Sequence, residues 1–168
     1  MGYPKRKKMR LPDYDYRQNG GYFVTICTHE KKCILSKVVP GNELRRAEVT
    51  LTPLGQVVES VLLAQIEKYG INLEAWTIMP NHVHLLLWIE EGRTSISIGR
   101  FVGALKSISA NQWMKIYNER GIVMGKLWQR DFYDHVIRNE TDYMEKLRYI
   151  DVNPDKWAMD ELYSEKRE

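Results

Sequence analysis

The pattern of apolar and polar positions along the chain predicts strands that alternate with amphipathic helices. Four segments have the apolar and β-branched character of strands: 22–28, 73–79, 82–89 and a stretch within 128–137. Only Pro80 and Asn81 separate the second strand from the third, which predicts an antiparallel hairpin. Residues 29–51 have no clear periodicity, and they predict a loop with a short strand near Val38.

Three further segments place apolar residues at helical spacing: 53–70, 95–118 and 139–153. Thr52 and Asn139 are suited to cap the first and the last of these helices, and Gly70 is suited to end the first. The resulting order is strand, helix, strand, strand, helix, strand, helix. This order predicts an α+β fold of ferredoxin-like or RRM-like type, in which helices pack on an antiparallel sheet.

The length of 168 residues suits one domain, and no linker or internal repeat divides the chain. We therefore expect a single domain, 1–168, that begins with a basic tail, 1–10. The net charge is only +3, yet five cations and no anion lie in this tail: Lys5, Arg6, Lys7, Lys8 and Arg10. Such a cluster can bind nucleic-acid phosphates, but it is more often a solvated chain end.

The composition argues against several other classes of protein. No apolar run approaches the roughly 18 residues of a membrane-spanning helix, and no apolar stretch follows the basic N-terminus as it would in a secretory signal. Cys27 and Cys33 are too few for a disulfide framework and lack the spacing of a paired zinc site. We therefore expect no membrane partner and a cytoplasmic location.

The sequence His82-Val83-His84 is the strongest indication of chemistry. Because side chains alternate across a strand, both histidines lie on one face and Val83 lies on the other. Two imidazoles at this spacing can bind one metal ion, but they cannot complete its coordination sphere. The alternative is a pair of surface histidines on a half-exposed sheet.

The last predicted helix offers a third ligand and a nucleophile. Its core-facing stripe is Tyr143, Leu147 and Ile150, whereas Tyr149 and Asn153 lie on a different stripe, four residues apart. If this helix covers the histidine face, Asn153 can supply an oxygen ligand and Tyr149 can attack phosphorus beside a divalent cation. Taken alone, an asparagine before proline also ends many helices, and half-buried tyrosines are common.

Three ordered blocks resemble conserved segments of one protein family. Residues 79–84, MPNHVH, resemble the HUH signature (histidine, hydrophobic residue, histidine) of single-tyrosine transposases. Residues 128–135, WQRDFYDH, and 149–154, YIDVNP, resemble segments of the REP-associated tyrosine transposase (RAYT) branch. Residues 10–16 and 21–28 are also similar to that branch, so the resemblance extends over most of the chain.

This resemblance implies an HUH endonuclease fold and a role for each site residue. His82 and His84 match the metal-binding histidines, Tyr149 matches the nucleophile and Asn153 matches the third ligand. The implied reaction is cleavage of single-stranded DNA next to hairpins through a 5′-phosphotyrosine intermediate, with Mg²⁺ or Mn²⁺ as the metal. Covalent storage of the bond would let another strand be joined without ATP. The resemblance thus implies a nucleoid-associated enzyme of DNA transposition.

Cations in the tail and near the predicted site are the expected DNA contacts: Lys5, Arg6, Lys7, Lys8, Arg10, Lys106, Arg130 and Arg138. Trp88 and Trp128 could stack on unpaired bases, although tryptophans in such strands are more often core residues. His135 is interpreted as structural or DNA-adjacent, and no general base for Tyr149 is evident.

Two other functions stay open on the sequence. One is a non-catalytic nucleic-acid-binding module of ferredoxin-like fold, and the other is a metal-dependent phosphodiesterase that activates water. The oligomeric state is open as well, between a monomer and a homodimer whose subunits exchange the tyrosine helix.

Overall fold

A four-stranded antiparallel sheet lies at the centre of the structure, a computed structural model that describes residues 19–119, 125–160 and 162. Its strands are β1 (Gly20–Cys27), β4 (Asn72–Ile78), β5 (His82–Ile89) and β6 (Tyr133–Val136). The order across the sheet is β4-β5-β1-β6, and each neighbouring pair is antiparallel. The long central strands β1 and β5 therefore have a hydrogen-bonded neighbour on both sides.

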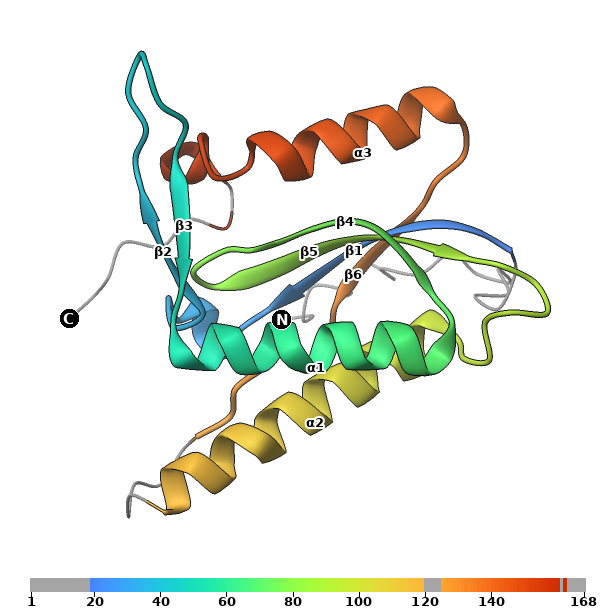
Figure 1. Ribbon diagram of the computed structural model, residues 1–168, viewed down its shortest axis with the longest axis horizontal. Helices are drawn as coiled ribbons and strands as arrows, with labels where there is room; N and C mark the ends of the chain where they lie inside the picture. The colour runs from blue at the N-terminus through green and yellow to red at the C-terminus, as the bar shows by residue number, and fades with distance from the viewer. Residues whose placement is uncertain (1–18, 120–124, 161, 163–168) are drawn as a thin grey trace, which may run out of the picture.

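Helices cover both faces of this sheet (Figure 1). The three helices are α1 (Pro53–Tyr69), α2 (Ile98–Asn118) and α3 (Glu140–Val152). Helices α1 and α2 lie together on one face, and α3 crosses the other face alone. Each helix begins at a polar residue whose side chain accepts a hydrogen bond from a backbone N–H of the first turn: Thr52, Ser97 and Asn139.

The alternation of side chains along β5 divides the core between the two faces. One set packs in the main core with α1 and α2: Val83, Leu85, Leu87 and Ile89. On the other face, Leu86 packs with Phe23 and with Ile150, the one buried residue of α3. Because this second cluster is small, α3 buries fewer apolar side chains than α1 and α2 do.

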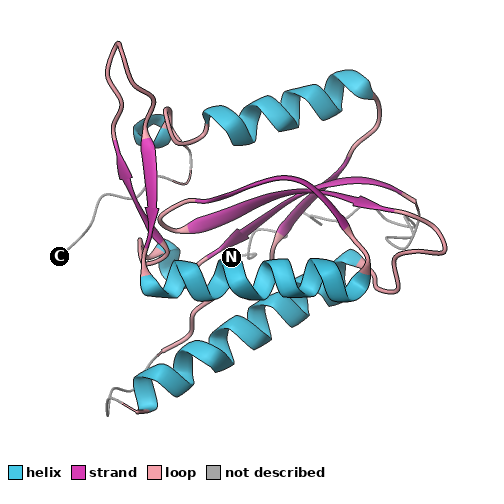
Figure 2. Cartoon of the chain, viewed as in Figure 1, coloured by secondary structure: helices cyan, strands magenta, loops and turns pink. Residues whose placement is uncertain are grey.

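A second, two-stranded hairpin joins β1 to α1. It consists of β2 (Ser36–Val39) and β3 (Glu48–Leu51), paired antiparallel. In Figure 2 this hairpin rises from the level of α1 to the C-terminal end of α3. Two short 3₁₀ turns, η1 (His29–Lys31) and η2 (Trp157–Met159), follow β1 and α3 respectively.

The structure confirms the predicted α+β, ferredoxin-like architecture, including the hairpin at Pro80 and Asn81. Helix α2 begins three residues later than the pattern predicts, because Ser97 rather than an earlier residue caps it. The last strand is also shorter than the predicted segment, since Trp128 forms only an isolated bridge with Thr28. Among the described residues, no helix combines the length and apolar character needed to cross a membrane.

Candidate active site and metal centre

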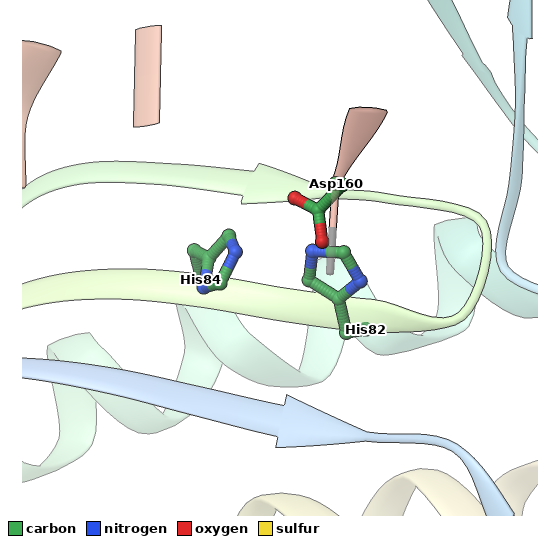
Figure 3. A group of neighbouring side chains, drawn as sticks. All are labelled: His82, His84 and Asp160. Atoms are coloured by element: carbon green, nitrogen blue, oxygen red, sulfur yellow. The ribbon is translucent and has the colours of Figure 1, made fainter. Parts of the chain in front are cut away.

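His82 and His84 lie at the N-terminal end of β5 (Figure 3). They are on the face of the sheet that α3 covers, since the ring of Tyr149 on α3 contacts that of His84. Their side chains are almost fully buried, with residue exposures of 0% and 2%. The two ring centroids are 4.4 Å apart. The strand alternation predicted from the sequence therefore brings both imidazoles into one buried position, and the surface alternative is wrong.

The tautomer of His82 is determined by its neighbour Asn81. The Asn81 amide nitrogen donates to the carbonyl oxygens of Lys31 (3.2 Å) and Leu162 (2.7 Å), which fixes the orientation of the amide. Its oxygen therefore faces the Nδ1 atom of His82, 2.8 Å away. An amide oxygen only accepts, so Nδ1 carries the hydrogen and Nε2 keeps its lone pair.

His84 is oriented by a residue of the adjacent strand. Thr25 on β1 is paired with His84, and its hydroxyl lies 2.8 Å from the Nδ1 atom of His84. When Nδ1 donates to this hydroxyl, Nε2 is left as an available ligand. Burial lowers the pKa of His82 to about 4, against the opposing effects of Asp160 and Asn153, and burial lowers the pKa of His84 well below its usual value. Both imidazoles are thus neutral near pH 7, the form that binds metals.

Asp160 joins the two histidines, as Figure 3 shows. One ligand atom from each of His82, His84 and Asp160 lies within 4.8 Å of the others, a spacing that suits one shared ion. Asp160 is not among the residues predicted from the sequence, since it follows the η2 turn rather than a periodic helix or strand. No local pattern marks this aspartate, because it reaches the histidines only through the tertiary path of the chain.

Asn153 ends α3 beside this group. Its amide nitrogen donates to Asp160 Oδ2 at 2.7 Å. Within the described part of the chain, three buried atoms of the site have no hydrogen-bond partner: His82 Nε2, His84 Nε2 and Asn153 Oδ1. Buried polar atoms are costly unless they are satisfied. All three are electron-pair donors, so this set of residues fits a divalent cation.

Tyr149 lies one turn before Asn153 and remains 42% exposed. Its ring is 5.1 Å from that of His84 and 5.8 Å from that of Phe23, in both cases edge to face. Its hydroxyl donates to Asp160 Oδ2 over 3.4 Å. The phenol is thus next to the histidine pair of its own chain, and it is also open to a large substrate.

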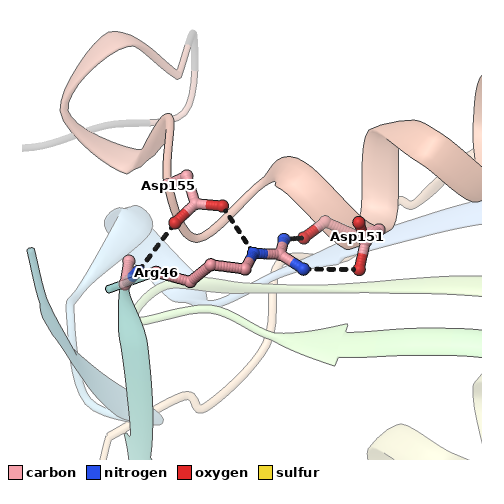
Figure 4. A network of polar contacts seen from close by, with 4 residues as sticks. Arg46, Asp151 and Asp155 are labelled. Atoms are coloured by element: carbon pink, nitrogen blue, oxygen red, sulfur yellow. Dashed lines mark hydrogen bonds and ion pairs between the residues drawn. The ribbon is translucent and has the colours of Figure 1, made fainter. Parts of the chain in front are cut away.

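Polar contacts hold both ends of α3 against the rest of the molecule. At the C-terminal end, the Arg46 guanidinium binds Asp155 (3.0 Å) and Asp151 (3.1 Å), as shown in Figure 4. At the N-terminal end, His135 Nε2 lies 2.8 Å from a carboxylate oxygen of Asp142. The predicted core stripe of α3 also packs on the sheet as expected. These contacts set the position of the helix that carries Tyr149.

The predicted DNA contacts have different surroundings. The five tail cations lie outside the described residues. Arg130 and Arg138 are exposed, on either side of β6. The ammonium of Lys106 donates instead to three backbone carbonyls of residues 129–131. Trp128 is a core residue whose indole donates to Ser109. Contact with DNA by these cations remains a prediction.

Comparisons with known proteins agree with this geometry. The family described as "Transposase IS200 like" matches residues 22–153. An uncharacterised protein of Haemophilus influenzae is 30% identical, over 96% of this chain and 95% of its own length. The REP-associated tyrosine transposase of Escherichia coli K12 is 26% identical, over 67% of this chain and 61% of its own length.

A solved structure shares the fold. The structure of a REP-associated tyrosine transposase bound to a REP hairpin superposes with a TM-score of 0.64 at 20% identity, covering 88% of this chain and 73% of that one. The match to residues 22–153 includes the histidine motif, Tyr149 and Asn153, so the resemblance found in the sequence is confirmed. The chain belongs to the IS200-like transposase family, and its activity is that of a DNA transposase.

Proposed function

We propose that this transposase nicks and joins single-stranded DNA next to a hairpin, with Tyr149 as the nucleophile. The observation that carries the proposal is the position of the Tyr149 hydroxyl beside a buried group of unsatisfied ligand atoms. A surface histidine pair would not be buried. A simple binding module gives no reason to bury ligand atoms without partners, which is energetically costly.

The ligand set we propose is His82, His84 and Asn153, extended by Asp160. Two imidazoles with a neutral amide oxygen and a carboxylate suit Mg²⁺ or Mn²⁺ and leave positions for phosphate and water. When bound, such an ion polarises the phosphoryl oxygen and stabilises the charge that develops on it. The hydrogen bonds that His82 donates to Asn81 and His84 donates to Thr25 leave both Nε2 atoms available for this role.

The chain's own residues carry the covalent step. The Tyr149 oxygen forms a bond to phosphorus while the bond from phosphorus to the 3′ oxygen breaks, and the phenolic proton departs as the 3′-hydroxyl gains one. The product is a 5′-phosphotyrosine, which a second 3′-hydroxyl can attack in the reverse sense. Asp160 accepts the hydrogen bond of the phenol and so orients it beside the histidines.

The substrate follows from the relatives. One solved relative is bound to a REP hairpin, so we propose that hairpin DNA with an adjoining single strand is the partner here too, which would place the protein with the chromosome. All the proposed site residues come from one chain, and this supports a monomer as the catalytic unit rather than a dimer that exchanges α3.

The test is trapping of the covalent intermediate. Labelled hairpin DNA with single-stranded flanks is incubated with Mn²⁺, and the protein is resolved by denaturing electrophoresis. We expect a labelled adduct with the wild type and none with Tyr149→Phe, although DNA binding persists. Tyr143→Phe is the matched control, because Tyr143 lies on the same helix and its hydroxyl donates to Glu74 rather than to the site.

The other outcomes identify the alternatives. An adduct with Tyr149→Phe would remove Tyr149 from its role. Cleavage without an adduct, retained by the same variant, would identify a phosphodiesterase that activates water. Binding without cleavage, unaffected by chelation, would identify a non-catalytic binding module.

A further inference from the structure

A groove of about 470 Å³ opens beside Tyr149 and His84. This volume is typical of a site for a small ligand or for one unit of a polymer. Four of its lining residues come from the segment 129–133, within the WQRDFYDH block: Gln129, Asp131, Phe132 and Tyr133. His84, Tyr149 and Asp160 also line the groove, so it is continuous with the proposed site, but the proposed covalent chemistry uses none of these four residues.

Lys106 on α2 holds this segment in place. Its Nζ donates to the carbonyl oxygens of Gln129 (3.0 Å), Arg130 (3.2 Å) and Asp131 (3.0 Å). An ammonium has three N–H donors, and three carbonyls match that number. The same nitrogen lies 5.6 Å from the centre of the Phe132 ring. Burial lowers the pKa of Lys106, while the Asp131 carboxylate acts in the opposite direction. Residues 129–131 belong to no strand, and their backbone is held by this lysine together with the hydrogen bond from the Gln129 N–H to the Cys27 carbonyl oxygen (3.0 Å).

The lining of the groove combines flat apolar surfaces with hydrogen-bonding groups. Phe132 and Tyr133 contribute aromatic rings, of which Tyr133 is 46% exposed, whereas Phe23 is buried and stacks on His84. Asp131 contributes an exposed carboxylate and Gln129 an amide. Aromatic rings stack on unpaired bases, and a carboxylate accepts hydrogen bonds from their N–H groups. A DNA phosphate held at the histidine pair would bring a neighbouring base close to these residues.

We propose that this groove binds one unpaired nucleobase next to the scissile phosphate, that Asp131 selects bases rich in N–H donors, and that Lys106 is a positioning residue for the groove wall. The proposal rests on the proposed function of the adjacent site. Guanine is the expected preference, since its adjacent N1–H and N2–H groups match the two oxygens of one carboxylate. Thymine is the least suitable base, because carbonyl oxygens flank its single N–H on both sides.

The base preference can be measured apart from catalysis. The probes are fluorescein-labelled DNA strands of five sugar-phosphate units with four abasic positions and one central base, and the protein is the Tyr149→Phe variant. We expect guanine to bind about tenfold more tightly than thymine in fluorescence anisotropy, and every base to bind more tightly than a fully abasic strand. Asp131→Asn should bring the ratio of guanine to thymine close to one. Equal affinities for the four bases, or for the abasic strand, would overturn the proposal.

A comparison of two lysine variants tests the positioning role of Lys106. Lys106→Met should weaken binding of all four bases, whereas Lys115→Met removes the same charge from an exposed position on the same helix and should not. Equal effects of the two variants would refute the role of Lys106. If Lys106→Met unfolds the segment, Asp131→Asn still tests the base preference, because Asp131 is exposed and its replacement leaves Lys106 in place. These binding measurements need no nucleophile. The proposal for the groove can therefore be refuted while Tyr149 still forms adducts, and the groove can select bases even if Tyr149 forms no adduct.

Discussion

Replacement of Thr25 by valine tests how the protein prepares His84 for a metal. Thr25 and Thr77 flank His84 on the two neighbouring strands, in register with it on either side. Only the Thr25 hydroxyl bonds the imidazole, at 2.8 Å, whereas the Thr77 hydroxyl donates to the sulfur of Met79 at 3.6 Å. Valine keeps the shape of threonine and removes the hydroxyl, so the two substitutions form a matched pair.

The size of the effect follows from two independent arguments. Loss of a group that orients a metal-binding histidine costs about 10- to 100-fold in metal affinity, or about 1.4–2.8 kcal/mol. Metal binding through Nε2 fixes the hydrogen of His84 on Nδ1. Without Thr25 this buried N–H has no acceptor, since His84 is only 2% exposed, and a buried N–H left without an acceptor costs about 1–3 kcal/mol. We therefore expect Thr25→Val to bind Mn²⁺ about 10- to 100-fold more weakly, and Thr77→Val to bind it almost as the wild type does.

The assay is calorimetric titration of the chelator-treated protein with Mn²⁺ at pH 7.5, followed by adduct formation over a range of Mn²⁺ concentrations. Saturating Mn²⁺ should restore most of the rate to Thr25→Val, since the defect lies in affinity. The reasoning is refuted if Thr25→Val binds Mn²⁺ within twofold of the wild type, or if Thr77→Val loses as much affinity.

Three further changes probe the helix and the metal. Chelation with EDTA should abolish adduct formation and leave the far-ultraviolet circular dichroism unchanged, because the apolar core does not depend on the ion; added Mn²⁺ should restore the adduct. Ile150→Ala should lower the free energy of unfolding by about 2 kcal/mol in urea titrations, near the lower end for buried isoleucine because its cluster is small. Arg46→Ala should slow adduct formation, by up to about 10²-fold where the displacement of α3 reaches 1 Å, while Arg45→Ala, the exposed neighbour, should not.

The parts of the site that the sequence predicts correctly are those governed by local periodicity. The alternation along 82–89 places both histidines on one face, and the helical stripe of α3 separates Ile150 from Tyr149. Each of these predictions depends on the geometry of one strand or one helix. The caps Thr52 and Asn139 are confirmed for the same reason, since a cap is set by contacts within one turn.

The parts that sequence patterns miss depend on contacts between distant segments. Asp160 reaches the histidines only because η2 turns the chain back toward them. The carboxylate of Asp142 pairs with His135 and accepts a hydrogen bond from the backbone N–H of Arg138, and no local pattern in the sequence indicates either partner. Lys106 lies on a basic helix and is therefore expected to contact phosphate. Its ammonium instead donates to backbone carbonyl oxygens of a segment more than 20 residues away. Charge alone does not reveal such partners.

Asn81 links these local and distant contributions. The sequence marks it as a turn residue before the histidines, but its amide nitrogen binds carbonyl oxygens of Lys31 and Leu162, which lie 50 and 81 positions away. The same side chain determines the tautomer of His82. Leu162 lies two residues after Asp160, and its backbone N–H donates to the Asp160 carboxylate. The residue that prepares the first histidine as a ligand therefore also anchors the segment that brings the aspartate, so that Asp160 is held at the ligand group by the histidine motif itself.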